Sequence, residues 1–595
     1  MSIAAIIKQH AETAIKELYQ FEPKPTDVVV SQTKPEFEGD YTIVLFPFVK
    51  QLKKSPDALG QEIGSWLQTN ANGLFSGFNI IKGFLNLSVG NTYWLEFLAK
   101  ENQNKSFGHQ PANAQKVMVE YSSPNTNKPL HLGHLRNNFL GWSIAEIFKA
   151  NGFEVIKTCI ANDRGIHICK SMVAWQLFAN GATPESAGIK GDHLVGEYYV
   201  KFGDELKKQV SELIANGTRK EEAEKEAPIM KAAQQMLVDW EAGEPAVIEL
   251  WEKMNAWVYA GFNETYKRIG SDFNKTYYES EVYLSGKKMV EDGLEKGVFF
   301  EKEDTSVWID LTADGLDQKI VRRSDGTAVY MTQDIGLAEI KQQDFNADRS
   351  IYVVGDEQNY HFKVLKLICE KLKLPAAEGI YHLSYGMVEL PTGRMKTREG
   401  TVVDADEICD EMEKVAKEKT EELGKTEGFT AEELTKLYHT LGMGALKFFL
   451  LRVDPKKKML FNPEESIDFH GFTGPFIQYT HARIKSILRK MADGGWQMAD
   501  VSISAGVLPL EKELVVLLEQ FPVTINQACA EMNPSLIAIY VFNLAKTFSS
   551  FYNEHSIANA ESEEKKQLRL AISGMTANVI ANGMQLLGIE VPERM

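Results

Sequence analysis

Two histidines three residues apart, His131 and His134, stand at the start of a segment whose apolar residues have helical spacing. An apolar run over 117–121 precedes them and indicates a buried parallel strand, with a loop rich in Pro and Asn between the two. The first turn of a helix offers free N–H groups and the positive end of the helix dipole. Gly133 has no side chain, so a planar ligand can approach the backbone closely. Because residues three apart share a helix face, we expect both histidines to reach one phosphate group of a nucleotide.

The same histidine pair could instead be half of a metal site. A third ligand at a usable spacing is missing, and metal-binding histidine pairs on helices more often have a Glu between them. We therefore favour a nucleotide site.

A second group of charges that could serve a nucleotide lies in the Gly-flanked segment 385–400, which contains Arg394, Lys396 and Arg398. A loop with fixed positive charge could close over a triphosphate and stabilise the charge that develops on departing pyrophosphate. On its own, the segment could equally be a basic hairpin turn. Its occurrence together with the histidine motif, in the other half of the predicted sheet, favours the phosphate role.

These motifs must be positioned by strands and helices. The order of strand and helix patterns over 116–406 predicts an α/β catalytic domain with a doubly wound parallel sheet of the Rossmann type. The first strand, the helix after it and a second strand at 154–160 form a β-α-β unit. A charged, mostly helical insertion without an obvious parallel strand follows over about 183–300. In a doubly wound sheet split in this way, a ligand is expected at the switch point between the halves. Strand patterns resume at 306–310, 328–331 and 350–354.

The two ends of the chain predict further domains. Residues 1–110 are expected to form an α+β domain with an early helix, a helix capped by Ser55 and a strand near 78–89. The region 407–595 is almost wholly helical and ends in an amphipathic segment over 568–587.

Composition limits the class of protein. A chain of 595 residues, 44% of them hydrophobic, can form several domains, and it has no apolar run long enough to span a membrane. The first residues lack the basic and apolar regions of a signal peptide. The five cysteines include no C-x-x-C pair, which favours a reducing compartment, so we expect a cytoplasmic enzyme. The net charge of −17 disfavours a nonspecific nucleic-acid binder, although basic residues outnumber acidic ones between Lys447 and Lys490.

Taken together, the motifs resemble those of class I aminoacyl-tRNA synthetases. His131-Leu-Gly-His134 is similar to the HIGH signature, and Arg394-Met-Lys-Thr397 is similar to the KMSK loop. More closely, the chain resembles the arginyl-tRNA synthetase family along essentially its whole length. This narrower match is carried by the segments 120–125, 325–334, 474–483 and 587–595.

The resemblance implies a reaction. Arginine would attack the α-phosphate of ATP to give arginyl-adenylate and pyrophosphate, and the arginyl group would pass to the 2′-hydroxyl of the terminal adenosine of tRNA(Arg). Positioning and electrostatics would dominate, with the histidines holding phosphate oxygens. Mg²⁺ would accompany ATP, held mostly by phosphates and water. The implied ATP-binding residues are His131, Gly133, His134, Arg394, Met395, Lys396 and Arg398.

The arginine substrate makes its own demand on the site. A guanidinium is planar and offers its donors in a fixed fork, so a selective pocket needs carboxylates that accept it in-plane. Glu120 at a strand end and Asp334 near a helix start suit this role. The family's pattern puts them there, with Tyr330 lining the pocket. The resemblance also assigns Asn125 and Gln358 to the α-amino and carboxylate groups of the substrate.

Both carboxylates also have structural alternatives. Asp334 could simply cap a helix, and Glu120 could pair with Arg164 or Lys128.

Two positions depart from the family's pattern. Thr397 stands where the KMSK loop usually ends in lysine; in arginyl enzymes a lysine just before HIGH substitutes for it, which makes Lys128 a catalytic candidate beside His131 and His134. Arg164 stands where the family usually has the aromatic residue of Gly-Asp-Trp-Gly, and we leave it out of the site.

Recognition of RNA would be divided between the two ends of the chain. By resemblance, the helical region over about 446–595 is an anticodon-binding domain, and the N-terminal domain contacts the corner of the tRNA at its D-loop. Stacking on bases needs exposed aromatic side chains beside basic residues. The alternative is that these aromatics fill helix–helix cores. The candidate tRNA contacts are Phe84, Asn86, Phe476, Tyr479, Tyr552 and Met595.

Other functions compete with this one. A glutamyl, glutaminyl or cysteinyl enzyme would share HIGH, but cysteinyl enzymes have zinc ligands that this sequence lacks, and the others lack the pattern of Tyr330 and Asp334. A non-catalytic tRNA-binding relative is favoured only by the departure at Thr397. We expect an active ligase that is monomeric, has no editing domain and does not bind membranes.

Overall fold

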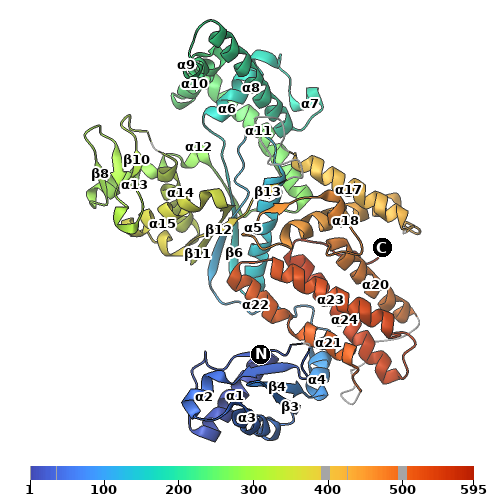
Figure 1. The fold of residues 1–595 in the computed structure, drawn as a ribbon. Coiled ribbons are helices and arrows are strands. Elements are labelled where there is room, and N and C mark those ends of the chain that lie inside the picture. Colours follow the sequence, from blue (N-terminus) through green and yellow to red (C-terminus); the bar gives the residue numbers. More distant parts are fainter. Residues whose placement is uncertain (1, 35, 328, 390–402, 425, 494–505) are drawn as a thin grey trace.

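A five-stranded parallel sheet lies at the centre of the computed structural model, which describes residues 2–34, 36–327, 329–389, 403–424, 426–493 and 506–595 (Figure 1). The strand order is β12-β11-β5-β6-β7, so β5 and β11 are neighbours at the point where the chain order reverses. The predicted doubly wound sheet and its switch point are therefore confirmed. Its strands are β5 (Lys116–Glu120), β6 (Glu154–Ala161), β7 (Lys275–Tyr278), β11 (Arg349–Gly355) and β12 (Ile380–Tyr385).

The helix after β5 is the most deeply buried element of this region. α5 (Leu132–Ala150) connects β5 to β6 and packs between the sheet and the C-terminal helices α18 (Ala431–Leu451) and α22 (Phe521–Glu531). Because α5 has neighbours on several sides, even polar residues such as Asn138 and Ser143 are buried in it. On the other side of the switch point, α15 (Asn359–Leu372) connects β11 to β12.

Two expectations about the sheet were wrong. The insertion was expected to hold no parallel strand, but β7 lies within that range and pairs with β6. Of the three later strand patterns, only 350–354 joins the parallel sheet. The first contributes β9 (Val307–Ile309) to a separate antiparallel sheet, and Tyr330 begins the helix α14 (Tyr330–Phe345). Short apolar runs suit a strand or a buried helix equally, so local pattern cannot separate the two.

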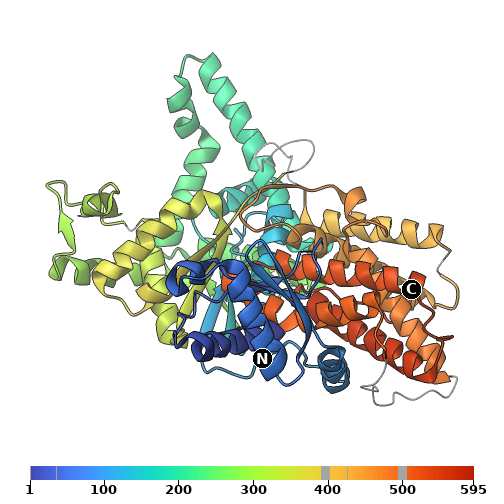
Figure 2. The same ribbon diagram turned by 60° about the horizontal axis from the view of Figure 1, so that its bottom comes forward.

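Two excursions leave the sheet. The first, between β6 and β7, is the helical insertion, and its long helices project from the body of the molecule (Figure 2). The second follows β7 and carries the small antiparallel sheet. The first excursion contains α6 (Ile166–Phe178), α7 (Pro184–Ala187), α8 (Gly191–Ala215), α9 (Lys220–Glu226), α10 (Pro228–Glu241) and α11 (Pro245–Ile269). The second contains α12 (Glu279–Val282), α13 (Ser285–Glu295), β8 (Phe299–Glu301), β9, η1 (Thr312–Asp314) and β10 (Lys319–Arg322).

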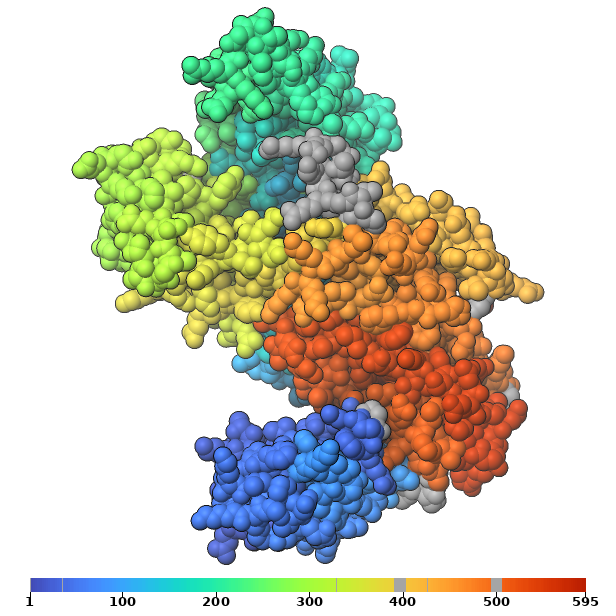
Figure 3. All heavy atoms as spheres, viewed as in Figure 1, coloured from blue at the N-terminus to red at the C-terminus, as the bar shows by residue number. Residues whose placement is uncertain are grey.

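The N-terminal residues form an α+β lobe at the opposite end of the molecule from the insertion (Figure 3). The strand expected near 78–89 is in fact a hairpin, because Lys82 and Gly83 both have positive φ and reverse the chain in two residues. Its four-stranded sheet has the order β1-β2-β4-β3. The lobe comprises α1 (Ile3–Tyr19), β1 (Val30–Gln32), β2 (Tyr41–Val44), α2 (Phe46–Leu52), α3 (Pro56–Asn70), β3 (Phe75–Ile81), β4 (Phe84–Val89) and α4 (Asn91–Glu101).

The C-terminal part is helical, as predicted, and its core is continuous with that of the N-terminal lobe and of the sheet. In the part of the chain that the structure describes, no helix combines the length and apolar character needed to cross a membrane. The remaining elements are η2 (Asp356–Gln358), α16 (Ala376–Gly379), β13 (Val388–Glu389), α17 (Ala405–Glu422), β14 (Met459–Leu460), α19 (Pro463–Ser466), α20 (Gly474–Asp493), α21 (Pro509–Glu519), α23 (Ser535–Glu554) and α24 (Glu563–Leu586).

Candidate active site

The histidine motif forms the N-terminus of α5. His131 is the cap residue, and its Nδ1 accepts a hydrogen bond from the N–H of Gly133 at 3.1 Å. In return, Nδ1 of His134 accepts a hydrogen bond from the N–H of His131, also at 3.1 Å. Because each Nδ1 is an acceptor, each neutral ring carries its proton on Nε2. The two ring centroids are 3.9 Å apart.

Burial keeps both histidines uncharged. The pKa of His131 falls to about 3 because of burial and the positive charge of Lys128. The pKa of His134 lies well below its ordinary value because of burial and the neighbouring His131. The pair can therefore offer a phosphate two neutral N–H donors, held in place by the helix start and free of mutual repulsion.

The backbone between β5 and the histidines has an unusual conformation. Ser122 and Ser123 both have positive φ, of 84° and 45°, which is uncommon for residues with side chains and clusters at functional sites. The N–H of Ser122 donates to Oδ1 of Asn137 at 2.5 Å, and Nδ2 of Asn137 donates to the carbonyl of Val353 at 2.7 Å. Asn137 thus holds the strained loop to β11. Sequence analysis missed it, although a polar residue in so apolar a helix is a usable signal.

Glu120 lies at the end of β5 and is buried. Its carboxylate forms an ion pair with the ammonium group of Lys341 from α14, which is also buried. Neither of the partners considered from the sequence, Arg164 or Lys128, is the one observed. Lys341 was missed because it stands 221 positions after Glu120, and local pattern does not report such a distant pairing.

Asp334 lies within α14, whose cap residue is Val329, so the structure rules out the helix-cap alternative. Its Oδ2 is 2.6 Å from Nε2 of His361, a residue of α15. Tyr330, at the start of α14, is 74% exposed, so its ring is open to a ligand. Burial raises the pKa of Tyr352 well above its ordinary value, and the charges of Glu120 and Asp334 both add to that rise. The two carboxylates therefore lie around one buried side chain of β11.

A third carboxyl group, that of Glu279 after β7, belongs to the same neighbourhood. Burial raises its pKa to about 7; the charge of Arg164 opposes that rise, whereas Asp163 and Asp334 strengthen it. A carboxyl group with such a pKa gains its charge readily when a cation arrives. Sequence analysis missed Glu279 because it follows a strand that the pattern did not reveal.

Asn125 and Gln358 lie where the topology predicts a ligand. Asn125 is in the loop after β5, where it forms an isolated bridge with Asn162, and Gln358 ends η2, directly after β11. Both side chains are exposed. They follow the carboxyl ends of the two strands that meet at the switch point.

Lys128 lines a cavity of about 400 Å³ together with His193 and Asp404. Burial lowers its pKa below the ordinary value. The predicted phosphate-binding residues Arg394, Met395, Lys396 and Arg398 lie outside the described residues. After them the chain runs beside the histidine motif: the N–H of Ala405 donates to the carbonyl of Leu130 at 3.0 Å, and that of Leu132 donates to the carbonyl of Val403 at 3.3 Å.

Arg164 packs between the two excursions, against residues of α10 and against Tyr283 at the end of α12. Its guanidinium lies 3.8 Å from the ring centroid of Tyr283 and 5.1 Å from that of Trp240, and it donates to Glu241 at 2.8 Å. The aromatic rings and the carboxylate stabilise the charge of Arg164, although its buried Nε has no hydrogen-bond partner among the described residues. Its contacts account for a charged residue at this position.

The two candidate tRNA contacts of the N-terminal lobe differ sharply. Phe84 is 39% exposed at the start of β4 and packs edge-on against Phe46. Asn86 is buried; its Oδ1 accepts a hydrogen bond from Thr42 at 2.7 Å, and its Nδ2 donates to Asn79 at 2.9 Å. In this structure the side chain of Asn86 links neighbouring strands of the sheet, and it is not placed to touch RNA.

The C-terminal candidates form a stacked group. The guanidinium of Arg483 lies 4.6 Å from the ring centroid of Tyr479 and 5.1 Å from that of Tyr552. Base stacking requires exposed aromatic rings; Tyr552 is 40% exposed, whereas Tyr479 is partly buried against the core. Phe476, by contrast, packs against Phe542, with ring centroids 5.4 Å apart, as the core alternative predicted. Met595 is half-buried against the helical core.

Comparison with known families identifies all three parts of the chain. Residues 96–462 match the family model described as tRNA synthetases class I (R), catalytic domain. Residues 477–595 match the DALR anticodon binding domain, and residues 5–89 match the arginyl tRNA synthetase N terminal domain.

Individual proteins agree with the family models. The chain is 53% identical over 585 residues to an arginine–tRNA ligase of Bacteroides thetaiotaomicron, covering 98% of each chain, and 51% identical over 597 residues to one of Amoebophilus asiaticus, covering all of both. Among solved structures, Thermus thermophilus arginyl-tRNA synthetase shares the fold, with a TM-score of 0.80 at 24% identity over the full length of both chains. The chain therefore belongs to the class I arginyl-tRNA synthetase family.

Proposed function

We propose that this chain joins arginine to tRNA(Arg) in two steps. A carboxylate oxygen of arginine attacks the α-phosphorus of ATP, a bond to phosphorus forms, and the bond to pyrophosphate breaks. The 2′-hydroxyl of the terminal adenosine then attacks the carbonyl carbon, loses its proton, and displaces AMP. The observation that carries the proposal is the pair of neutral histidine N–H donors beside the switch point, with the buried carboxylate of Glu120 at the end of β5 near them.

The phosphates of ATP would meet the N-terminus of α5. Nε2–H of His131 and of His134 would donate to phosphate oxygens, while Gly133 would leave space for the adenine. Lys128 would supply positive charge close by, and its cavity next to the motif supports this role. Mg²⁺ would enter with ATP, bound mostly by phosphates and water. Arg394, Met395, Lys396 and Arg398 would complete the phosphate contacts from the opposite half of the sheet.

The arginine would lie across the ends of β5 and β11. Asp334 would accept the guanidinium in-plane, with the exposed ring of Tyr330 beside it. Glu120 would supply a second carboxylate and Glu279 a third, the latter charging fully only when a cation binds. Asn125 and Gln358 would bind the α-amino and carboxylate groups of the substrate. An uncharged analogue of the guanidinium would leave these carboxylates unpaired and would therefore be rejected.

The tRNA would span the molecule from the catalytic domain to both ends. The stacked group of Tyr479, Arg483 and Tyr552 would receive bases of the anticodon loop, with Met595 at its border. Phe84 would pack against the corner of the tRNA. Salt dependence of binding would report how many phosphates are engaged.

The decisive experiment is arginine-dependent ATP–pyrophosphate exchange, measured with and without tRNA(Arg). We expect exchange with arginine when tRNA(Arg) is present. Absence of exchange under both conditions would refute the proposal, and exchange with glutamate or cysteine instead would assign the site to another amino acid.

A further inference from the structure

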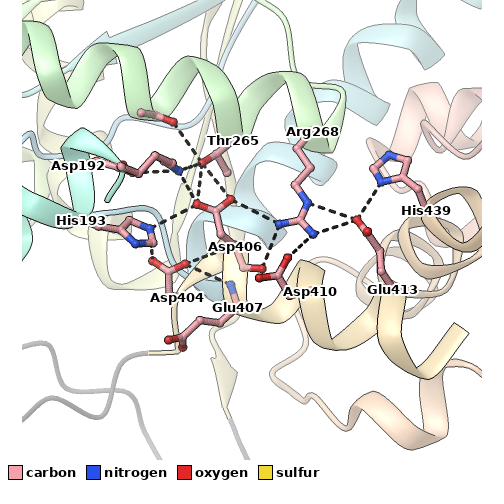
Figure 4. Close-up of polar contacts among 12 residues, drawn as sticks. Asp192, His193, Thr265, Arg268, Asp404, Asp406, Glu407, Asp410, Glu413 and His439 are labelled. Carbon is pink, nitrogen blue, oxygen red and sulfur yellow. Dashed lines mark hydrogen bonds and ion pairs between the residues drawn. The ribbon is translucent and has the colours of Figure 1, made fainter. Parts of the chain in front are cut away.

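A cluster of ion pairs joins the helical insertion to the segment that lies beside the histidine motif (Figure 4). His193, in the first turn of α8, places Nε2 3.3 Å from Oδ2 of Asp404 and 3.4 Å from Oδ2 of Asp406. Lys190, the cap residue of α8, also binds Asp406 and donates to Oγ1 of Thr265 in α11 at 2.6 Å. Side chains of α8 and α11, two helices of the insertion, thus bind the start of α17.

The cluster has the composition of a cation site but not its charge balance. Asp192, His193 and Asp406 have ligand atoms close enough to share one ion. However, the ammonium group of Lys190 already lies on Asp406 and 3.4 Å from Asp192, and the guanidinium of Arg268 donates to the carbonyl of Asp406 at 3.2 Å. Protein cations therefore supply the charge that a metal would bring, so we treat the cluster as a structural joint.

The joint holds a segment that touches the catalytic motif directly. Asp404 caps α17 through Oδ1, which accepts a hydrogen bond from the N–H of Asp406 at 2.8 Å, while its other oxygen faces His193. The backbone of Asp404 pairs antiparallel with that of His131. Hydrogen bonds on either side of this pair, from Ala405 to Leu130 and from Leu132 to Val403, complete a short ribbon. The backbone of His131 is therefore fixed on one side by residues 403–405.

We propose that His193 is a positioning residue for the activation of arginine. By binding Asp404 and Asp406 together, it holds residues 403–405 against residues 130–132 and so fixes the direction of the Nε2–H of His131. Without His193, Asp404 would lose its ion pair with α8, whereas Asp406 would keep Lys190 and Arg268, so the segment beside His131 would be held less directly. The inference rests on the proposed contact between His131 and ATP. It gives the insertion a part in catalysis without any contact to substrate.

The test compares two histidines that lie on different helices, α8 and α18, and that each contact carboxylates of α17 or its cap residue. His193→Ala removes the pair at the start of α17. His439→Ala removes the pair between His439 and Glu413 further along α17, where Nδ1 and Oε1 are 2.9 Å apart. The two histidine side chains are similarly exposed, at 33% and 40%, so the control matches in residue type and exposure; its partner Glu413 is also bound by Arg268 at 2.9 Å. Both are assayed in ATP–pyrophosphate exchange with saturating tRNA(Arg), and the concentration of active sites is titrated in each.

We expect His193→Ala to lower the exchange kcat per active site about tenfold or more, since small displacements of a catalytic group are costly, with the KM for arginine within about twofold of wild type. His439→Ala should leave kcat unchanged, and His193→Arg, which restores a cation, should recover part of the loss. Equal losses in both alanine variants, or an unchanged kcat in His193→Ala, would overturn the inference.

A third variant separates this inference from the role of the histidine motif. His131→Ala should lower kcat at least as far as His193→Ala does. If His131→Ala were harmless, the proposed ATP contact would fall, and the inference with it. If only His131→Ala were harmful, the ATP contact would stand and the inference about His193 would be wrong.

Discussion

The buried pair of Glu120 and Lys341 offers the sharpest test of how the arginine pocket is built. Lys341→Met keeps most of the length of the side chain and removes its charge. The carboxylate of Glu120 then has no cation in the empty site and must either stay charged inside the protein or take a proton. Both side chains are less than a tenth exposed, so solvent cannot compensate for the loss.

The magnitude follows from two independent routes. Breaking a buried ion pair by removing one partner costs about 3–5 kcal/mol. Holding a carboxyl group protonated at pH 7, when its ordinary pKa is about 4.3, costs about 1.36 kcal/mol per pH unit, or about 4 kcal/mol. A protonated carboxyl group needs no cation, so the cost is absent at low pH, where the unfolded chain is protonated as well, and it grows as the pH rises. At pH 5 it should be only about 1 kcal/mol.

Local hydrogen exchange is the suitable assay, because a chain of several domains does not unfold in one step. Amide protection in β5 and α14 should fall in Lys341→Met at pH 7 and approach that of the wild type at pH 5. The double variant Lys341→Met/Glu120→Gln should regain most of the protection, since no buried charge is stranded. The KM for arginine should rise about tenfold or more in the single variant, because a charged hydrogen bond contributes about 1.5–3 kcal/mol. Unchanged protection and unchanged KM at pH 7 would refute the reasoning.

Three further predictions concern single groups. Lys128→Ala should lower the rate of ATP–pyrophosphate exchange far more than Thr397→Ala does. Equal losses would contradict the proposal that Lys128 replaces the lysine that the KMSK loop usually has at position 397. Asp334→Asn should raise the KM for arginine about tenfold to a hundredfold through loss of a charge-assisted contact; weaker binding of ATP with unchanged binding of arginine would show that the assignment is wrong. The neighbouring carboxylates of Asp404 and Asp406 raise the pKa of His193 to about 10. The stability that His193 adds is therefore full below about pH 6.5 and lost as the pH rises towards 10, so thermal unfolding of wild type and His193→Gln should converge at alkaline pH.

The parts of the site that the sequence predicts are those that local chemistry determines. The strand before the histidine motif and the helix that begins at the motif depend on neighbours a few positions away. The buried pairing of Glu120 with Lys341 depends on two segments meeting in the folded sheet, and neither residue carries a local sign of it. β7 escaped prediction because four residues after a long helical insertion give too short a pattern.

Burial decided the remaining differences. Asn86 and Phe84 are two positions apart on one strand and looked equally suited to RNA, yet the neighbouring Thr42 and Asn79 enclose the amide and leave the ring exposed. Likewise, Phe476 and Tyr479 share a helix, but only the tyrosine stacks on an arginine. In each pair both residues share a face of their element, so the depth to which each is covered depends on its neighbours in the assembled structure and not on the local pattern.

The central position of β5 in its sheet has a consequence for how the chain folds while it is being synthesised on the ribosome. Its neighbour β6 leaves the ribosome soon after it, but β11 follows only after both excursions have been made. Until then, one edge of β5 is unpaired, and Asn137 lacks the carbonyl of Val353 that anchors the loop before the histidines. The nascent chain therefore cannot complete the proposed ATP site early in its synthesis. Meanwhile the open strand edge must be protected from other chains.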